Sequence, residues 1–210
     1  MNNGNRTMEF CVNRLLIPLA LTLVSLGAYA QSPNAVIEEA VTEISSQLNG
    51  RKEELASDTQ ALYALIDEIL LPRFDRRYAA QLVLGKHWRT ASDEQRVEFI
   101  DAFYHSLLRK YADGVLEFDE DKISVLPFRG DETKSRTVVR TEVRLDDGTK
   151  VPVNYGLVKR ESGWLMFDVI IEGISYVRNF RVELNSEIQA GSLDAVIERL
   201  RSDVAVAEEA

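Results

Sequence analysis

Residues 139–171 read VRTEVRLDDGTKVPVNYGLVKRESGWLMFDVII, and most of this stretch alternates apolar with polar side chains. Successive side chains of a β-strand point to opposite faces of the sheet, so a period of two predicts strands with one buried face. Asp146-Asp147-Gly148 and Glu161-Ser162-Gly163 are turn sequences typical of short hairpins. The stretch therefore predicts three antiparallel strands over residues 139–145, 151–157 and 165–171.

A fourth strand is expected upstream, over Ile123–Leu126, which gives a four-stranded or slightly larger antiparallel sheet. Short turns make neighbours in sequence pair with each other, so we expect the strands in sequential order. The last strand is apolar on both faces, with Phe167 and Val169 on one side and Trp164 and Met166 on the other. Both sides of the sheet therefore need a cover near that strand.

The sequence on either side of the strands has helical periodicity. Ser32-Pro33 is a typical helix start, with a cap residue followed by proline, and Ser92-Asp93-Glu94-Gln95 matches a capping box. Apolar spacing and turn residues predict helices over residues 33–48, 58–70, 75–85, 92–116, 174–190 and 193–201. A helical half therefore precedes the strands, and the chain returns to helix after them.

The N-terminus has the pattern of a secretory signal peptide. Leu15–Leu26 is an apolar run of about a dozen residues, and Ala28-Tyr29-Ala30 is a small-x-small cleavage signal before Gln31. The run is short for a membrane anchor, the alternative reading, because a spanning helix needs about 20 residues. We expect residues 1–30 to be cleaved, residues 31–203 to form a single domain, and residues 204–210 to be a frayed tail.

Composition narrows the possible chemistry. The one cysteine, Cys11, precedes the apolar run and leaves with the signal peptide, so the mature chain has no disulfide or thiolate site. Removing two arginines and one glutamate with that peptide leaves 23 basic and 33 acidic residues, a net charge of −10. An acidic protein repels the phosphate backbone, so we expect no nucleic-acid partner.

We find no catalytic constellation. His87 and His105 are the only histidines, and eighteen residues separate them, which is not a local metal-ligand spacing. Residues 130–135, GDETKS, imitate a phosphate-binding loop but lack the glycine before Lys-Ser and a following helix. We therefore expect no catalytic residues, no metal site and no enzyme activity.

The most specific stretch is Ile69–Leu116. It carries Leu71-Pro72-Arg73-Phe74-Asp75, Leu84-Gly85-Lys86-His87-Trp88, Ala91-Ser92-Asp93-Glu94-Gln95, and a helix with Phe99, Phe103 and Tyr111. These motifs resemble the MlaC family, also called the toluene-tolerance or ABC-transporter auxiliary component family. Asp168-Val169, Glu172-Gly173-Ile174-Ser175 and Asn179-Phe180-Arg181 extend the resemblance over essentially the whole mature chain.

The resemblance implies a periplasmic phospholipid carrier that helps to maintain outer-membrane lipid asymmetry. Its implied partners are phospholipid, an inner-membrane ABC transporter with a membrane-anchored lipid-binding subunit, and an outer-membrane lipoprotein–porin complex. The implied fold is α+β, a curved antiparallel sheet wrapped by helices around an apolar cavity, NTF2-like in part. No cofactor is implied, because the phospholipid is cargo, and we expect a monomer.

Given that implied cavity, we select apolar and tyrosine residues of the long helix and the strands as candidate lipid contacts. They are Tyr104, Leu107, Leu108, Tyr111, Val139, Val143, Val153, Tyr155, Phe167 and Val169. Ordinary core packing is the alternative for each, because a cavity wall and a packed core have the same composition. Two other functions also stay open at this point: an NTF2-like small-molecule enzyme, and a lipid-free periplasmic adaptor protein.

Overall fold

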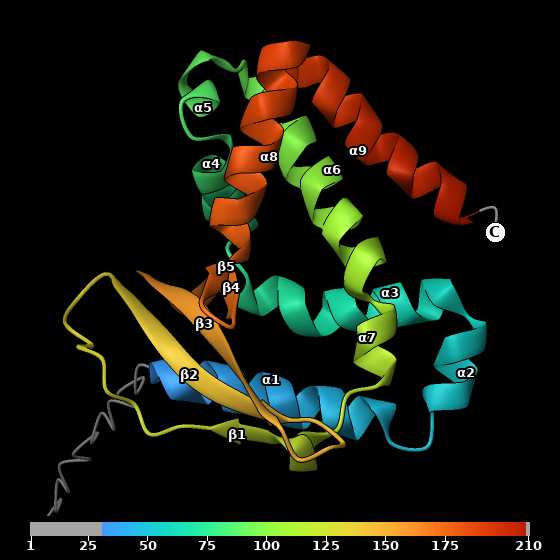
Figure 1. Cartoon of the computed structure of the whole chain (residues 1–210), viewed down its shortest axis with the longest axis vertical. Helices are drawn as coiled ribbons and strands as arrows, with labels where there is room; N and C mark the ends of the chain where they lie inside the picture. The colour runs from blue at the N-terminus through green and yellow to red at the C-terminus, as the bar shows by residue number, and fades with distance from the viewer. Residues whose placement is uncertain (1–30, 209–210) are drawn as a thin grey trace, which may run out of the picture.

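The computed structural model of this protein describes residues 31–208 and contains one five-stranded antiparallel sheet and a set of helices (Figure 1). The predicted signal peptide, residues 1–30, lies outside the described residues. The strands follow one another across the sheet in sequential order, as predicted. They are β1 (Ile123–Val125), β2 (Arg136–Arg144), β3 (Lys150–Arg160), β4 (Gly163–Ile171) and β5 (Ile174–Ser175).

The helices precede and follow the sheet in sequence, which confirms the α+β class. Those before it are α1 (Pro33–Leu48), α2 (Lys52–Ser57), α3 (Thr59–Leu70), the 3₁₀ turn η1 (Leu71–Arg73), α4 (Arg76–Leu84), α5 (His87–Thr90), α6 (Asp93–Tyr111), α7 (Asp113–Leu116) and the 3₁₀ turn η2 (Glu120–Lys122). Those after it are α8 (Tyr176–Ala190) and α9 (Leu193–Glu208).

The predicted helix starts are present at atomic detail. The Ser32 hydroxyl accepts a hydrogen bond from the backbone N–H of Ala35. At the start of α6, the Ser92 hydroxyl accepts from Gln95 N, and the Gln95 side chain accepts from Ser92 N, each at 3.0 Å. These two bonds form the capping box, which satisfies donors that the first turn of a helix leaves open.

Three predicted boundaries were wrong. The fifth strand, β5, occupies residues assigned to a helix, because Glu172 and Gly173 take positive φ angles of 50° and 82° and turn the chain back along β4. The predicted helix over 92–116 divides at Ala112 into α6 and α7. Helix α9 continues to Glu208, past the predicted end of this helix at residue 201, since the segment contains neither glycine nor proline to end it.

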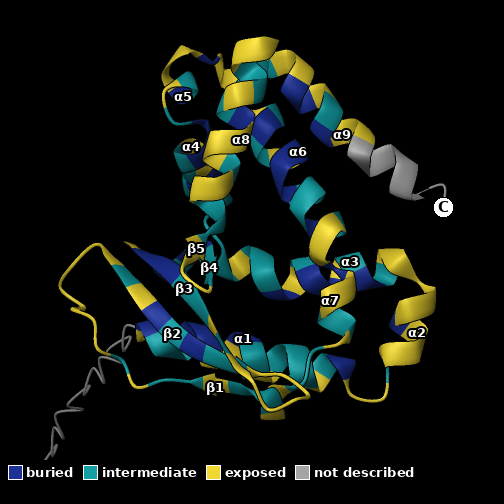
Figure 2. Cartoon of the chain, viewed as in Figure 1, coloured by how far each residue is buried: buried dark blue, intermediate teal, exposed yellow. Residues whose placement is uncertain are grey.

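One face of the sheet packs on α1. Val36 and Ile37 of α1 pack with Leu157, Trp164 and Met166 of the strands, and all five are 5% exposed or less. Figure 2 shows this dark-blue contact below a second group of buried helix faces. That second group comes from α4, α6, α8 and α9, and it stands above the end of the sheet (Figure 1).

Strand β4 has a cover on both sides, as its apolar faces predicted. Trp164 and Met166 belong to the α1 contact, whereas the Phe167 ring packs edge-on against Tyr78 of α4 at 5.1 Å between centroids. The pairing of β3 with β4 shifts register between Gly156 and Leu157, which leaves Phe167 as an extra residue opposite this step. Because of this bulge, side chains of β4 pack against α1 on one side and against α4 on the other.

Candidate functional site

An apolar cavity of about 500 Å³ lies between the sheet and the helices α3, α6 and α8. Its walls come from seven helices and strands, from Phe74 after the 3₁₀ turn η1, and from Ala112 between α6 and α7. The lining residues are Ile66, Leu70, Phe74, Ala79, Phe103, Tyr104, Leu107, Leu108, Tyr111, Ala112, Gly114, Val115, Tyr155, Phe167, Asp168, Val169, Ile171, Tyr176, Val177 and Phe180.

Helix α6 supplies one continuous wall. Phe103, Tyr104, Leu107, Leu108 and Tyr111 recur at intervals of three or four residues, so they lie on one face of the helix. Phe103 is 5% exposed and Tyr111 is 41% exposed. The wall therefore runs from the buried middle of the molecule to its surface, and the cavity opens near the C-terminal end of α6.

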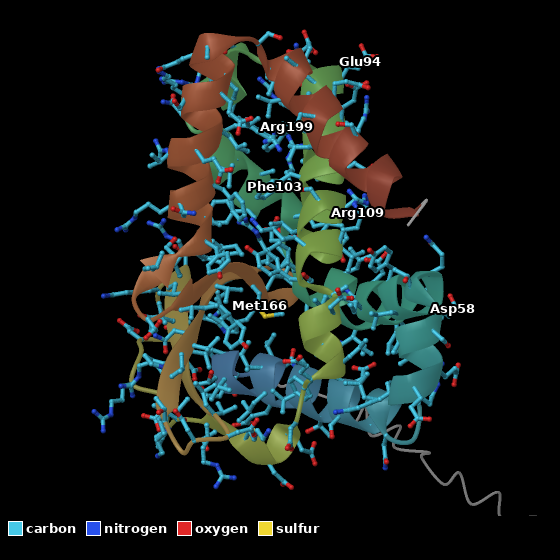
Figure 3. All side chains as sticks on the ribbon, turned by 45° about the vertical axis from the view of Figure 1, so that its right-hand side comes forward. Asp58, Glu94, Phe103, Arg109, Met166 and Arg199 are labelled. Atoms are coloured by element: carbon cyan, nitrogen blue, oxygen red, sulfur yellow. The ribbon has the colours of Figure 1, made fainter. Side chains whose placement is uncertain are left out.

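Aromatic pairs connect α6 with α8 across the cavity. The ring of Phe103 packs edge-on against Phe180 at 5.3 Å, and Tyr111 packs edge-on against Tyr176 at 5.7 Å. Figure 3 shows Phe103 in the space between these two helices. Edge-to-face pairs of this kind stabilise the position of both rings. They keep the two helices at a fixed separation.

On the strand side of the cavity, the side chains of Phe167 and Asp168 lie close to the backbone of Gly156. A Cβ atom added there would lie 3.1 Å from the Phe167 ring and 3.2 Å from Cβ of Asp168. These distances are shorter than ordinary van der Waals contact, so any larger residue displaces one of the two side chains. Glycine at this position therefore sets where Phe167 and Asp168 lie against the cavity.

Asp168 is the one charged residue in the lining, and it is 7% exposed. Its Oδ2 accepts a hydrogen bond from the Ser175 hydroxyl at 2.6 Å, and its Oδ1 accepts from the backbone N–H of Val177 at 3.0 Å. A carboxylate is stabilised at a helix N-terminus, where backbone donors are open. Asp168 thus attaches α8 to β4. Both of its carboxylate oxygens already accept hydrogen bonds from within the protein.

Tyr104 places a phenol against the cavity with its hydroxyl occupied. It donates a hydrogen bond to Oδ1 of Asp67 at 2.6 Å, and the Arg76 guanidinium lies 5.0 Å from the ring centroid. Burial, followed by the hydrogen bond to the Asp67 carboxylate, raises the pKa of Tyr104 well above its usual range. The group therefore acts as a permanent donor, not as an acid or a base, at neutral pH.

Two other tyrosines of the lining, Tyr155 and Tyr111, also have raised pKa values. Burial raises the pKa of Tyr155. Burial, followed by the neighbouring Tyr176, raises the pKa of Tyr111. Each phenol is therefore neutral at physiological pH, and the cavity surface stays uncharged apart from Asp168.

Seven of the ten candidate contacts line this cavity: Tyr104, Leu107, Leu108, Tyr111, Tyr155, Phe167 and Val169. Val139, Val143 and Val153 do not. Val139 is fully buried beneath α1, while Val143 and Val153 lie nearer the hairpin that joins β2 and β3. The alternation had placed all three on the same face as Tyr155, but α1 covers Val139. Lipid contact by the seven remains a prediction.

The sequence reading missed the contribution of α8 and α3. Tyr176, Val177 and Phe180 sit at spacings that bring them to one side of α8, and Ile66 and Leu70 do the same on α3. These stripes were visible in the sequence, but they look like ordinary core. Asp168 was also missed, although a lone carboxylate within an apolar strand is a signal in itself.

The histidines lie away from the cavity. His87 Nε2 is 3.0 Å from Oδ1 of Asn185, and His105 Nδ1 is 2.9 Å from the carbonyl oxygen of Asp101. Within residues 31–208, no group of three or more metal-binding side chains is found. None of the helices in the same range has the length and apolar content needed to cross a bilayer.

The sequence has a clear family match. The family model described as MlaC protein matches residues 38–202. Toluene tolerance protein ttg2D of Pseudomonas putida is 30% identical over 202 residues, which cover 95% of this chain and 94% of that protein. The intermembrane phospholipid transport system binding protein MlaC of Haemophilus influenzae is 24% identical over 169 residues, 79% of each chain.

A solved structure has the same fold. The phospholipid-binding protein of Ralstonia solanacearum, determined in complex with a phospholipid, superposes with a TM-score of 0.75. The match covers 83% of this chain and 98% of that chain, at 23% sequence identity. The arrangement of sheet and helices described above is therefore shared with that protein.

Proposed function

Because this chain belongs to the MlaC family, we propose that it is a phospholipid carrier that holds acyl chains in the cavity between the sheet, α3, α6 and α8. The lining carries the proposal. Of its twenty residues only Asp168 is charged, and that carboxylate is bonded to Ser175 and Val177. A cavity of this size and polarity is typical of sites for apolar ligands.

The energetics of transfer favour such a lining. Each CH₂ group removed from water is worth about 0.8 kcal/mol. An acyl chain in a bilayer is already out of water, so a carrier has only to offer an equally apolar environment. Strong polar contacts inside the cavity would hold the lipid and oppose its release. The uncharged tyrosines and aliphatic residues of this cavity meet that condition.

The proposal extends to the place of action and the partners. The predicted export signal and the family point to the periplasm, where the carrier moves lipid between an outer-membrane lipoprotein–porin complex and an inner-membrane ABC transporter. The name of the Haemophilus influenzae relative contains intermembrane phospholipid transport, and that of the Pseudomonas putida relative contains toluene tolerance. Both names fit a role in keeping the outer membrane asymmetric.

An enzymatic role has less support in this cavity. A general acid and base require two titratable groups near a bound substrate. The lining contains one carboxylate, which already accepts two hydrogen bonds, and tyrosines that stay protonated at neutral pH. A lipid carrier needs no acid or base in the cavity, only an apolar lining, and this lining is apolar.

Organic extraction of the purified chain from residue 31 onward tests the proposal. We expect phospholipid to copurify and to be seen by native mass spectrometry as a bound mass. Leu107→Trp puts a larger side chain into the cavity wall, so we expect this variant to retain much less lipid and to transfer it poorly.

Val97→Trp is the matched control, because Val97 lies on the same helix but is 63% exposed. It should retain the lipid of the wild type. If the wild type carries no phospholipid and takes none up from vesicles, the carrier proposal is wrong, and the lipid-free adaptor becomes the better explanation.

A further inference from the structure

A second cavity of about 350 Å³, lined by both apolar and charged residues, adjoins the apolar one. Leu107 of α6 and Phe180 of α8 line both cavities. The remaining walls of the second cavity come from Ser106, Arg109, Lys110, Glu183, Leu184, Arg199 and Leu200. The two cavities therefore share a wall made of these two apolar side chains.

The charge of the second cavity contrasts with the rest of the protein. Three of its lining residues are cations, Arg109, Lys110 and Arg199, and one is an anion, Glu183. Arg199 of α9, labelled in Figure 3, is paired with Glu187 of α8 at 2.9 Å between Nη2 and Oε2. The whole chain has 34 acidic residues and 25 basic ones. With Glu183 and Glu187 counted against the three cations, one excess positive charge remains beside the apolar cavity in an otherwise acidic protein.

Lys110 lies at the boundary between the two cavities. Its Nζ is 5.7 Å from the centroid of Tyr111, which lines the apolar cavity, and 5.8 Å from that of Phe180, which lines both. Its side chain is exposed and forms no ion pair with any described residue. The ammonium group therefore keeps its donors available for an anion that arrives from the opening of the apolar cavity.

We propose that Lys110, with the cations of the second cavity between α6, α8 and α9, binds the phosphate group of a lipid whose acyl chains occupy the apolar cavity. This inference rests on the carrier function proposed above. A phospholipid has its charged phosphodiester close to the point where its acyl chains begin. The two adjoining cavities reproduce that order, with apolar walls followed by cations. Lysine is a common binder of phosphate as a point charge.

The expected contribution is modest, which suits a carrier that must release its cargo. An exposed charge pair is weakened by solvent and salt. We expect Lys110→Met to lower the affinity for phosphatidylglycerol about three- to fivefold. The affinity for diacylglycerol with the same acyl chains, which lacks phosphate, should not change. Methionine keeps an apolar stem over the rings of Tyr111 and Phe180.

The test compares dissociation constants of the delipidated chain for phosphatidylglycerol and diacylglycerol that carry the same fluorescent acyl chain. Lys110→Arg should keep the preference for the phospholipid. Lys159→Met is the matched control, since Lys159 also lies over an aromatic ring, that of Trp164 at 5.5 Å, but lines neither cavity. It should behave as the wild type.

Excess inorganic phosphate separates two sources of the same chemistry. If it competes with phosphatidylglycerol in the wild type but not in Lys110→Met, the site accepts free phosphate as well as a lipid headgroup. If it does not compete, the site needs the attached acyl chains. In both cases the Lys110-dependent preference supports the phosphate site.

Other outcomes overturn it. Equal weakening of both lipids by Lys110→Met would mean that the side chain acts through apolar packing, and no change in either would mean that it does not contact the headgroup. A change in the rate of transfer from vesicles without a change in affinity would place Lys110 at the membrane surface instead. If the wild type binds neither lipid, the proposed carrier function is wrong, and the proposed phosphate site is wrong as well.

Discussion

One face of the sheet is solid beneath α1 and hollow beside α3, α6 and α8. In the solid part, Val36 and Ile37 reach down to Val139 and Leu157, and none of the four is more than 2% exposed. In the hollow part, Tyr155, Val169 and Ile171 face about 500 Å³ of space. Residue types are the same on both sides, so composition does not separate a core from a cavity.

What differs is the way the covering helices are held. Helix α1 lies on the strands and its side chains interdigitate with theirs. Helices α6 and α8 are instead held apart by the pairs Phe103–Phe180 and Tyr111–Tyr176, and Asp168 anchors the start of α8. Rigid rings and one buried carboxylate keep the walls from closing. The predictions below, ordered by expected size, test this difference.

The largest effect is expected in the solid part. Ile37→Ala removes a side chain that is 2% exposed, and it leaves a void that close-packed neighbours cannot fill. We expect a loss of about 3–4 kcal/mol in the free energy of unfolding, measured by urea denaturation.

Ile174→Ala is the control, because the same change is made at a residue that is 62% exposed. Its cost should stay within about 0.5 kcal/mol. A cost below that figure for Ile37→Ala as well would contradict the view that α1 forms a solid core.

The second effect concerns the attachment of α8. Asp168→Ala leaves the Ser175 hydroxyl and the Val177 N–H without their acceptor, so we expect a loss of about 2 kcal/mol. Asp168→Asn retains one carbonyl oxygen and should cost less. Hydrogen exchange at the Val177 amide reports the local effect, and unchanged exchange in Asp168→Ala would show that the carboxylate does not hold α8.

The third effect depends on pH. Tyr104→Phe removes the hydrogen bond to Asp67 and should cost about 1.5 kcal/mol at neutral pH. Because the folded state raises the pKa of Tyr104 above its unfolded value, it retains the proton where the unfolded chain loses it. The stabilisation is complete below an unfolded pKa of about 10 and is lost as pH rises above it.

Urea denaturation at neutral and strongly alkaline pH measures this dependence. The wild type should lose stability faster than Tyr104→Phe above about pH 10. Tyr155→Phe, another cavity tyrosine whose pKa burial raises, should flatten the alkaline loss in the same direction. Parallel curves for the wild type and both variants would contradict these assignments.

The smallest effect is expected in the wall of the hollow part. Leu107 is half-buried and already lacks packing partners on its cavity side. Leu107→Ala should therefore cost less than about 1 kcal/mol in the free energy of unfolding. A cost close to that of Ile37→Ala would mean that the cavity is closed in solution.

Much of the fold follows from local sequence signals. The alternation in residues 139–171 and the caps at Ser32 and Ser92 predicted most strands and helix starts, because each depends on neighbours in the chain. The two-residue strand β5 was missed because it exists only through its pairing with β4 and the turn at Glu172 and Gly173.

The cavity was harder to predict for a physical reason. Alternation assigned Val139 and Tyr155 to one face, and the two residues are indeed paired across β2 and β3. It could not say that α1 covers the first and leaves the second beside open space. Tyr176 and Phe180 were missed in the same way, since which stripe faces a void depends on how helices distant in sequence are spaced.

The short outer strands have a consequence for behaviour at high concentration. β1 has three residues and pairs with residues 141–143 of β2, and β5 has two residues and pairs with Ile170 and Ile171 of β4. Each edge strand is therefore only a short template for pairing with another molecule. A chain with no cysteine after Cys11 cannot rely on disulfides to keep its sheet intact. Its edges limit strand-to-strand aggregation without them.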